Sequence, residues 1–223
     1  MNTYLQQASH GLRRLLSSSH RLQASCSSRL ASQCWKCRKT FPKGFPIHCN
    51  DCNVIQPIRA DQDYFGYFGM DQNFELNPDD LKKKFWKIQS VVHPDKYGMN
   101  EEKEQKYAEL HSSFANQAYK TLQNPRSRAL YMLELSKVEP SETDPAFAME
   151  ILELSEEIEE MTKAEDLNAK KHEIEASINE LLDSVAANFD KGANEEARES
   201  LNRLRYYDRM KKLVVRRLDE ISQ

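Results

Sequence analysis

The sequence predicts an all-α protein in three parts: a small N-terminal four-cysteine module, a helical hairpin and a C-terminal three-helix bundle. Only 6 Gly and 8 Pro occur among its 223 residues, and 30% of the residues are charged, a composition that favours slender helical bundles. Apolar residues recur at helical spacing along most of the chain after residue 80. Two Cys-x-x-Cys pairs precede these helices, in a segment too short to bury a core of its own.

The first 50 residues contain no acidic residue, although arginine, serine and leucine are frequent among them. This composition is typical of a mitochondrial transit peptide, and the continuous apolar stretch of a secretory signal is missing. A disordered N-terminal tail is the alternative. We assign residues 1–32 to a leader and expect roughly the first 25 to 32 residues to be removed. The mature protein is then expected in the mitochondrial matrix, with a cytoplasmic pool left open.

The segment 33–60 is defined by two Cys-x-x-Cys pairs separated by eleven residues: Cys34, Cys37, Cys49 and Cys52. Each pair places two thiolates on one turn, and two such turns supply the closed Cys₄ shell that zinc prefers in structural sites. Four ligands leave no open position, so the metal would hold the segment together rather than catalyse a reaction. Disulfides are the alternative, which a reducing compartment disfavours. The sequence does not distinguish zinc from iron.

Three neighbours of the cysteines bear on the geometry of this module. The commonest zinc-knuckle pattern has Gly after the second cysteine of each pair, whereas Arg38 and Asn53 stand there. Asn tolerates a left-handed backbone better than Arg does. His48 precedes Cys49 and is a competing ligand by position, but we expect it to be an ordinary exposed loop residue.

A helical hairpin is predicted around His93-Pro94-Asp95. The upstream helix begins at the cap Asn77 and carries one apolar stripe, Leu81, Phe85, Ile88 and Val92. Pro94 ends this helix because it lacks an N–H and biases the preceding residue out of the α region. The second helix begins near residues 100–104 and is expected to bury Tyr107, Leu110, Phe114 and Ala118. His93 and Asp95 should therefore be displayed at the tip of the pair.

Further features surround the hairpin in the region 61–137. A short helix is predicted over 63–68, with Tyr64, Phe65 and Phe68 packing beneath the pair. Asn124-Pro125 begins another helix, whose Leu130, Leu133 and Leu135 are expected in the core. Lys82, Lys83 and Lys87 lie outside the apolar stripe of the upstream helix, where they can meet an acidic partner surface. Because His93 has no nucleophile or metal ligand at useful spacing, we expect the chain itself to catalyse no reaction.

The segment 138–223 is predicted to form three helices of contrasting charge. The first helix has nine acids and no Lys or Arg between Val138 and Thr162. Its core stripe is followed by the stripes of two longer helices, which end before Lys191-Gly192 and near Ile221. The three stripes are Phe147, Ile151, Leu154, Ile158 and Met161; Leu167, Ile174, Ile178, Leu181 and Val185; and Leu204, Tyr207, Val214 and Leu218. Basic residues of the last helix can pair with the acidic first helix.

Met149 and Leu152 project from the first of these helices on the face opposite its core stripe, beside carboxylates. An apolar pair in such a place is either a surface accident or a partner site.

No stretch approaches the roughly 18 apolar residues of a membrane helix. The sequence shows no basic stripe on a packed surface of the kind that binds nucleic acid. The excess positive charge lies in residues 1–60, whereas residues 139–223 carry twelve basic and twenty-two acidic residues.

Several motifs in their order along the chain resemble a J-domain. These are DYFGYFGM (63–70), the basic helix, HPDK (93–96), NQAYKTLQNP (116–125) and RALYML (128–133). The similarity continues to about Tyr207 and is closer to the HscB type, the J-protein co-chaperones of iron–sulfur cluster biogenesis. Animal members of that family resemble this chain in having a tetracysteine module before the J-domain.

The resemblance implies an L-shaped molecule with two protein partners. His93, Pro94 and Asp95, with Lys82, Lys83 and Lys87, would bind a mitochondrial DnaK-type (heat-shock-seventy class) chaperone and stimulate its ATPase. An IscU-type iron–sulfur scaffold would bind the C-terminal bundle through Ala148, Met149, Leu152, Glu153, Glu156, Glu160, Arg205 and Tyr206. No nucleic acid or membrane is implied, and a homodimer is left open. The alternatives are a general mitochondrial J-protein in folding or import, and a zinc-ribbon nucleic-acid-binding protein.

Overall fold

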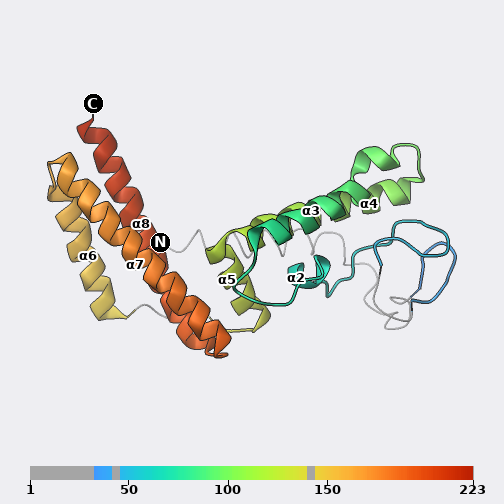
Figure 1. The fold of residues 1–223 in the computed structure, drawn as a ribbon, viewed down its shortest axis with the longest axis horizontal. Helices are drawn as coiled ribbons and strands as arrows, with labels where there is room; N and C mark the ends of the chain where they lie inside the picture. The colour runs from blue at the N-terminus through green and yellow to red at the C-terminus, as the bar shows by residue number, and fades with distance from the viewer. Residues whose placement is uncertain (1–32, 42–45, 140–143, 223) are drawn as a thin grey trace. The chain divides into compact units, whose positions relative to one another are not determined.

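The computed structural model describes residues 33–41, 46–139 and 144–222, so the predicted leader lies outside the described part of the chain. In these ranges the chain forms helices and two isolated antiparallel bridges, Gln33 with Thr40 and His48 with Ile55 (Figure 1). The all-α prediction is therefore confirmed. Along the same ranges, every helix is too short or too polar to cross a membrane.

The helices have the following bounds: α2 (Tyr64–Tyr67), α3 (Pro78–Val92), α4 (Glu102–Gln123), α5 (Pro125–Leu135), α6 (Pro145–Glu160), α7 (Ala164–Asp190) and α8 (Asn194–Ile221), with a 3₁₀ turn, η2 (Pro94–Tyr97), between α3 and α4. The predicted start signals are confirmed. The Asn77 side chain accepts hydrogen bonds from Asp79 N and Asp80 N, and Asn124 accepts one from Ser127 N. In both helices proline follows the cap, where its missing N–H leaves no bond unmade.

The described chain separates into two compact units. The first unit contains the residues up to Gln62 together with Pro94–His111, and the second contains Asp63–His93 and Ser112–Gln223. The first unit therefore joins the four-cysteine segment to η2 and the first turns of α4. The domain boundaries drawn from the sequence, after residues 32, 60 and 137, stay predictions.

The second unit has two hydrophobic clusters. One contains the aromatics of α2, Leu81 and Phe85 of α3, and Val185, Ala197 and Leu201 of the two long helices. The other contains the predicted stripe of α6, with Phe147, Ile151 and Ile158 buried against Leu167, Ile174, Met210 and Val214. Figure 1 shows α6, α7 and α8 running beside one another, and α8 contacts both α6 and α7. The three-helix bundle is confirmed.

The buried face of α4 agrees with the prediction only in part, since Ala118 is buried and Phe114 packs against the core, but Leu110 is not buried. Leu110 is 48% exposed, and the face that is buried carries Ala108, His111, Ala115, Ala118 and Leu122. Small side chains allow another segment to approach the helix closely, so they were buried in preference to larger apolar ones. In α5 only Leu133 of the three predicted core leucines is buried, because Leu130 and Leu135 are 37% and 38% exposed.

Candidate functional site

The His93-Pro94-Asp95 tripeptide lies where α3 gives way to η2. His93 is the C-cap of α3, with an extended ψ of 128° that the following proline favours. Pro94 then opens the 3₁₀ turn, and Tyr97 at the end of that turn is buried. His93 and Asp95 are both exposed, as the sequence predicted. A partner can therefore reach an imidazole and a carboxylate on one short, anchored turn.

The exposed face of α3 leads to this tip and carries three lysines. Lys82, Lys83 and Lys87 are exposed, and none of them forms an ion pair with another described residue. Lys84 differs, because its ammonium donates to the Gly69 carbonyl at 3.0 Å. The three lysines thus leave positive charge available to a partner, and such charges chiefly raise the rate of association and fix orientation.

Trp86 is a surface residue that sequence reasoning missed. Its side chain is 61% exposed on α3, between Lys83 and Lys87 in the chain, and its ring meets Phe85 edge-on with centroids 5.3 Å apart. Tryptophan is among the residues most enriched in the energetic centres of protein interfaces. Its position off the stripe of Leu81, Phe85 and Val92 was a signal that the sequence already contained.

The two Cys-x-x-Cys segments form equivalent turns. In the first, Cys34 N donates to Lys39 O at 2.8 Å and Arg38 N donates to Cys34 O at 3.0 Å. The second repeats both bonds, with Cys49 and Val54 2.9 Å apart and Asn53 and Cys49 also 2.9 Å apart. Arg38 and Asn53 have φ values of 64° and 56°, the left-handed conformation for which glycine is usually selected. The missing glycines therefore do not prevent the knuckle geometry.

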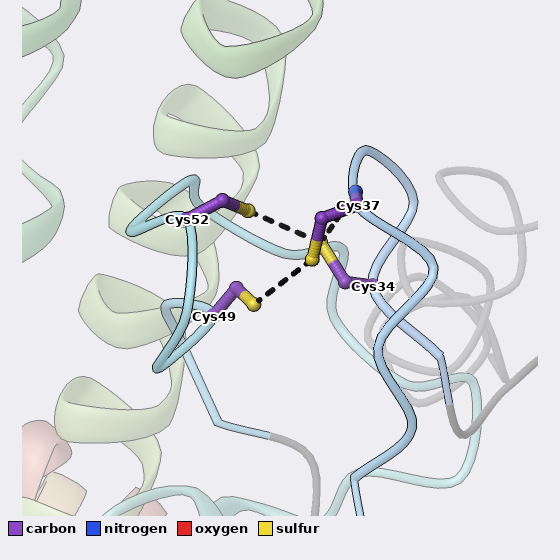
Figure 2. Close-up of side chains that lie close together, drawn as sticks. All are labelled: Cys34, Cys37, Cys49 and Cys52. Atoms are coloured by element: carbon purple, nitrogen blue, oxygen red, sulfur yellow. Dashed lines mark hydrogen bonds between the residues drawn. The ribbon is translucent and has the colours of Figure 1, made fainter.

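The four sulfur atoms converge from these two turns (Figure 2). All of them lie within 4.8 Å of one another, and the Cys34–Cys52 and Cys37–Cys49 Sγ pairs are each 3.6 Å apart. A tetrahedral ion with metal–sulfur bonds of about 2.3 Å requires sulfur–sulfur distances of about 3.8 Å. The donor set and its spacing therefore fit a four-coordinate metal ion.

The pKa values of these thiols favour a cation at the centre. Burial raises the pKa of Cys34, but hydrogen bonds from the backbone N–H groups of Cys37 and Lys36 outweigh it, and the pKa falls to about 6. At Cys37 a backbone hydrogen bond from Lys39 lowers the pKa, but burial and the neighbouring thiols raise it to about 12. One thiolate forms readily and opposes ionisation of its neighbours. A bound dication would offset that opposition at Cys37.

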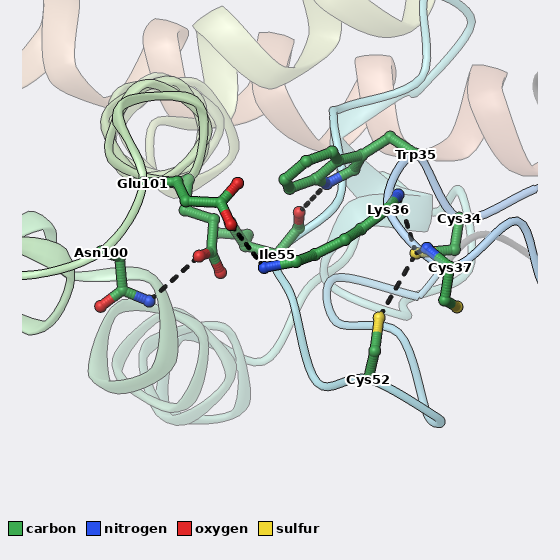
Figure 3. A network of polar contacts seen from close by, with 9 residues as sticks. Cys34, Trp35, Lys36, Cys37, Cys52, Ile55, Asn100 and Glu101 are labelled. Carbon is green, nitrogen blue, oxygen red and sulfur yellow. Dashed lines mark hydrogen bonds and ion pairs between the residues drawn. The ribbon is translucent and has the colours of Figure 1, made fainter.

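The four-cysteine segment contacts the turn and helix that follow the tripeptide, all within the first unit (Figure 3). Lys36 Nζ donates to Glu101 Oε1 at 2.6 Å. The Trp35 ring meets Tyr107 edge-on with centroids 6.1 Å apart, and the Lys103 ammonium lies 4.4 Å from the Trp35 ring centroid. The Trp35 indole N–H also donates to the Ile55 carbonyl at 2.7 Å, which fixes the ring.

Histidine 48 differs from the exposed loop residue that we expected. Its Nε2 shares a hydrogen bond of 2.6 Å with the Tyr97 hydroxyl, and the two rings stack. Partial burial lowers the pKa of His48. The correction arises because Tyr97 lies 49 positions further along the chain, so no local pattern around His48 indicated its partner.

A second buried histidine joins α4 to the four-cysteine segment. His111 Nε2 donates to the Gln56 carbonyl at 2.8 Å, and its side chain is almost fully buried. Burial is the main cause that lowers the pKa of His111, to about 4. Gln56 in turn donates through Nε2 to Cys34 Sγ at 3.4 Å. One residue therefore links a sulfur ligand to the buried face of the helix.

The apolar pair on α6 faces solvent, as the sequence predicted. Met149 and Leu152 are 65% and 59% exposed, and the other α6 residues of the predicted scaffold surface are exposed as well: Ala148, Glu153, Glu156 and Glu160. Tyr206 is not part of the predicted stripe of the last helix, yet it packs edge-on against buried Phe147. Arg205 lies over the Tyr206 ring at 5.1 Å.

A groove beside this face was not apparent from the sequence. It has a volume of about 640 Å³ and lies between α6, α7 and α8. Lys170 pairs there with Glu157 at 3.0 Å and with Glu173 at 2.8 Å, which neutralises part of its acidic lining. Glu153 contributes to both the groove and the face that carries Leu152.

An exposed His-Pro-Asp turn between an amphipathic basic helix and its hairpin partner defines a J-domain protein. Residues 63–131 match the DnaJ domain, and residues 143–214 match the HSCB C-terminal oligomerisation domain. The iron–sulfur cluster co-chaperone HscB homologue of Arabidopsis thaliana is 31% identical over 86% of this chain and 76% of its own length. The chain belongs to the HscB family of J-domain co-chaperones of iron–sulfur cluster assembly.

Two further proteins are similar over most of the chain. The iron–sulfur cluster co-chaperone HscB of Mus musculus is 29% identical over 91% of this chain and 88% of its own length. The crystal structure of the human co-chaperone HscB superposes with a TM-score of 0.78, at 29% identity, and covers 86% of this chain and 100% of that one.

Proposed function

We propose that this protein couples an IscU-type iron–sulfur scaffold to a DnaK-type, heat-shock-seventy class ATPase chaperone in the mitochondrial matrix. The tip formed by His93, Pro94 and Asp95 stimulates ATP hydrolysis by the chaperone. The exposed face of α6 holds the scaffold, so that the chaperone closes on a scaffold that is already delivered. The protein itself carries out no chemistry.

The observation that carries this proposal is the display of His93 and Asp95 on an anchored turn beside unpaired lysines. The lysines on α3 suit an acidic chaperone surface, and Trp86 among them supplies a rigid apolar contact of the kind that dominates interface energies. Together they provide both the charge that orients the complex and an anchor that slows its dissociation.

The assignment of the scaffold-binding surface to α6 rests on how its exposed face differs from the rest of the bundle. Met149 and Leu152 are large apolar side chains left in solvent, while the opposite stripe of α6 is fully used in the core. Exposed apolar side chains rimmed by carboxylates are typical of a transient protein interface. Because Tyr206 is packed on Phe147, we propose that it supports this surface from behind as much as it contacts the scaffold.

For the metal, we propose zinc in a structural role. Four cysteines with no open coordination position suit a structural zinc ion. The buried residues in the described part of the module are too few to hold it without that ion: Cys34, Cys49, Val54, Ile55 and Gln56.

One experiment tests the proposal with two variants measured in two assays. His93→Gln is expected to abolish stimulation of single-turnover ATP hydrolysis by the chaperone while leaving scaffold binding unchanged. The double substitution Met149→Ser and Leu152→Ser is expected to weaken scaffold binding about tenfold or more while sparing stimulation without scaffold. The controls are His172→Gln on the surface of α7 and Val215→Ser on α8. Full stimulation by His93→Gln would refute the proposed role of the tip.

A further inference from the structure

We propose that the four-cysteine module is a positioning device for the J-domain tip: bound metal fixes Trp35, Lys36 and His48, which hold η2 and the start of α4. The inference rests on the proposed function of the tip and adds a role for the metal in it. Metal loading then controls how well the chaperone is stimulated, although the metal touches neither partner.

The contacts are made by residues whose positions the metal ligands set. Trp35 and Lys36 are the two residues between Cys34 and Cys37. Binding of both flanking sulfurs to one ion would stabilise this turn, which the bonds from Cys34 N to Lys39 O and from Arg38 N to Cys34 O already define. Lys36 reaches Glu101, and Trp35 contacts Lys103 and Tyr107 at the start of α4.

The second cysteine turn makes the contact nearest to the tripeptide. His48 precedes Cys49, and it binds the hydroxyl of Tyr97, the last residue of η2. Tyr97 is only 7% exposed, so this hydrogen bond satisfies a phenol that the fold has removed from water. Asp95 lies two residues before Tyr97 in the same 3₁₀ turn. An anchored Tyr97 therefore limits the positions that the Asp95 carboxylate can adopt.

A third path connects a sulfur to the interior face of α4. Gln56 is fully buried and uses three groups at once: its Nε2 donates to Cys34 Sγ, its Oε1 accepts from Trp35 N, and its carbonyl accepts from His111. Gln56 Nε2 also donates to the Val54 carbonyl at 2.9 Å, so the amide keeps one acceptor if the Cys34 sulfur moves. Metal loss would then act on this path through Trp35 N, which follows Cys34 in the chain and is held by Gln56 Oε1, and so through Gln56 on His111 of α4.

These contacts join segments that are far apart in the sequence but lie in the same compact unit, which contains Pro94–His111. The 3₁₀ turn is short, and turns of this kind have poorer hydrogen-bond geometry than an α-helix. The first turns of α4 are therefore expected to depend on the module for order. Coupling of this kind is reciprocal: if bound metal stabilises this segment, the ordered segment must strengthen metal binding to the same extent.

The test uses the full chain loaded with zinc, the same chain stripped of metal, and a double variant, Glu101→Gln with Tyr107→Ala. This variant breaks two contacts on the helix side and leaves all four ligands and the residues between them intact. The matched control is Glu102→Gln with Leu110→Ala, which changes exposed residues of the same helix turns. Zinc affinity is measured by competition with a chromophoric chelator, and amide hydrogen exchange is followed residue by residue.

We expect zinc removal to speed amide exchange in residues 97–107 at least tenfold while α7 and α8 keep their protection. The double variant should bind zinc about three- to tenfold more weakly than the control, since exposed ion pairs and aromatic contacts each contribute modestly. Unchanged exchange in residues 97–107 on zinc removal, or equal zinc affinities in variant and control, would overturn the inference.

Stimulation of the chaperone ATPase supplies a third measurement. At sub-saturating concentrations, the stripped protein and the double variant should stimulate several-fold less than the loaded wild type, and zinc should restore the stripped protein. Equal stimulation by loaded and stripped wild-type protein would overturn the coupling. If the loaded wild type does not stimulate at all, the proposed function fails, while exchange and zinc affinity still decide whether the module positions the segment.

Discussion

The four-cysteine module and the C-terminal bundle are held together by different forces. The bundle buries its apolar stripes wholly or in part, with Ile158, Leu167 and Ile174 at most 2% exposed. The described part of the module buries only Cys34, Cys49, Val54, Ile55 and Gln56, and it has four convergent sulfurs and polar contacts to another segment in place of a larger core. From this difference we expect the module to depend on a bound ion and on a partner segment for its order, whereas the bundle depends mainly on its buried apolar side chains.

The largest effect should follow loss of a ligand from the module. Cys34→Ser removes a fully buried sulfur, and a structural zinc ion in a small domain contributes roughly 10 kcal/mol. We expect residues 33–62 to lose both metal and amide protection, while urea unfolding of the bundle is unchanged. Metal content by mass spectrometry and amide exchange measure the two effects.

The matched control for that change is Arg38→Gly, which keeps all four sulfurs. Because Arg38 has a φ of 64°, glycine should be tolerated or slightly stabilising there. A Cys34→Ser protein that retained metal and protection in residues 33–62 would contradict the comparison, since the module would then hold itself together.

The next effect concerns the bundle alone. Ile174→Ala creates a cavity at a site that is 2% exposed, which typically lowers the free energy of unfolding by about 2 to 5 kcal/mol. Urea denaturation followed by circular dichroism measures this loss, and Ile221→Ala, at a 38% exposed position, should cost far less. Zinc affinity should not change. A shift in zinc affinity would show that the two regions are not independent.

A third effect should appear as pH dependence of the first unit. The pKa of His111 is lowered by burial from its usual 6.5 to about 4, so the folded state holds a neutral imidazole. Between these values the unfolded chain binds more protons, and the free energy of unfolding therefore falls as the pH falls. The stability that neutral His111 contributes is fully present above pH 6.5. At pH 5, roughly 2 kcal/mol of the free energy of unfolding is lost.

Trp35 reports on this unit, because Trp86 can be replaced by Phe without touching it. Unfolding of the Trp86→Phe protein, followed by fluorescence at pH 7 and pH 5, gives the total pH effect, including that of thiolate protonation. The further substitution His111→Gln should reduce the difference between the two pH values by roughly 2 kcal/mol. An identical pH difference in both proteins would show that His111 does not contribute.

The sequence predicted the local features of the fold well because they depend on local rules. The stripe of α6, the caps Asn77 and Asn124, and the break at Pro94 each follow from spacing within a few residues. The prediction was wrong where burial depended on a distant segment. Leu110 is more apolar than His111, yet His111 is the buried one of the two, and its ring donates to Gln56, 55 positions away.

The candidate site likewise has local features that the sequence predicted and long-range contacts that it did not. The cysteine spacing and the tripeptide were sufficient to predict a metal-binding module and an exposed tip. The contacts between them were not predictable, since Lys36 and Glu101 are 65 positions apart and nothing near either residue indicates the other. Arg38 shows a further limit, because the hydrogen-bonded turn around Cys34 holds it in a backbone conformation that the residue itself disfavours.

The smallest effect should come from the ion pairs of the bundle. Arg216 Nη2 lies 2.6 Å from Glu159 Oε1, but the two side chains are 58% and 47% exposed. Water and salt screen such a pair, so Arg216→Gln should cost about 0.5 kcal/mol or less. A double-mutant cycle with Glu159→Gln isolates the pair, and it should be run at low and high salt. An interaction free energy above about 1 kcal/mol that did not change with salt would mean that the bundle also relies on polar contacts. The bundle and the module would then differ only in how much they rely on them.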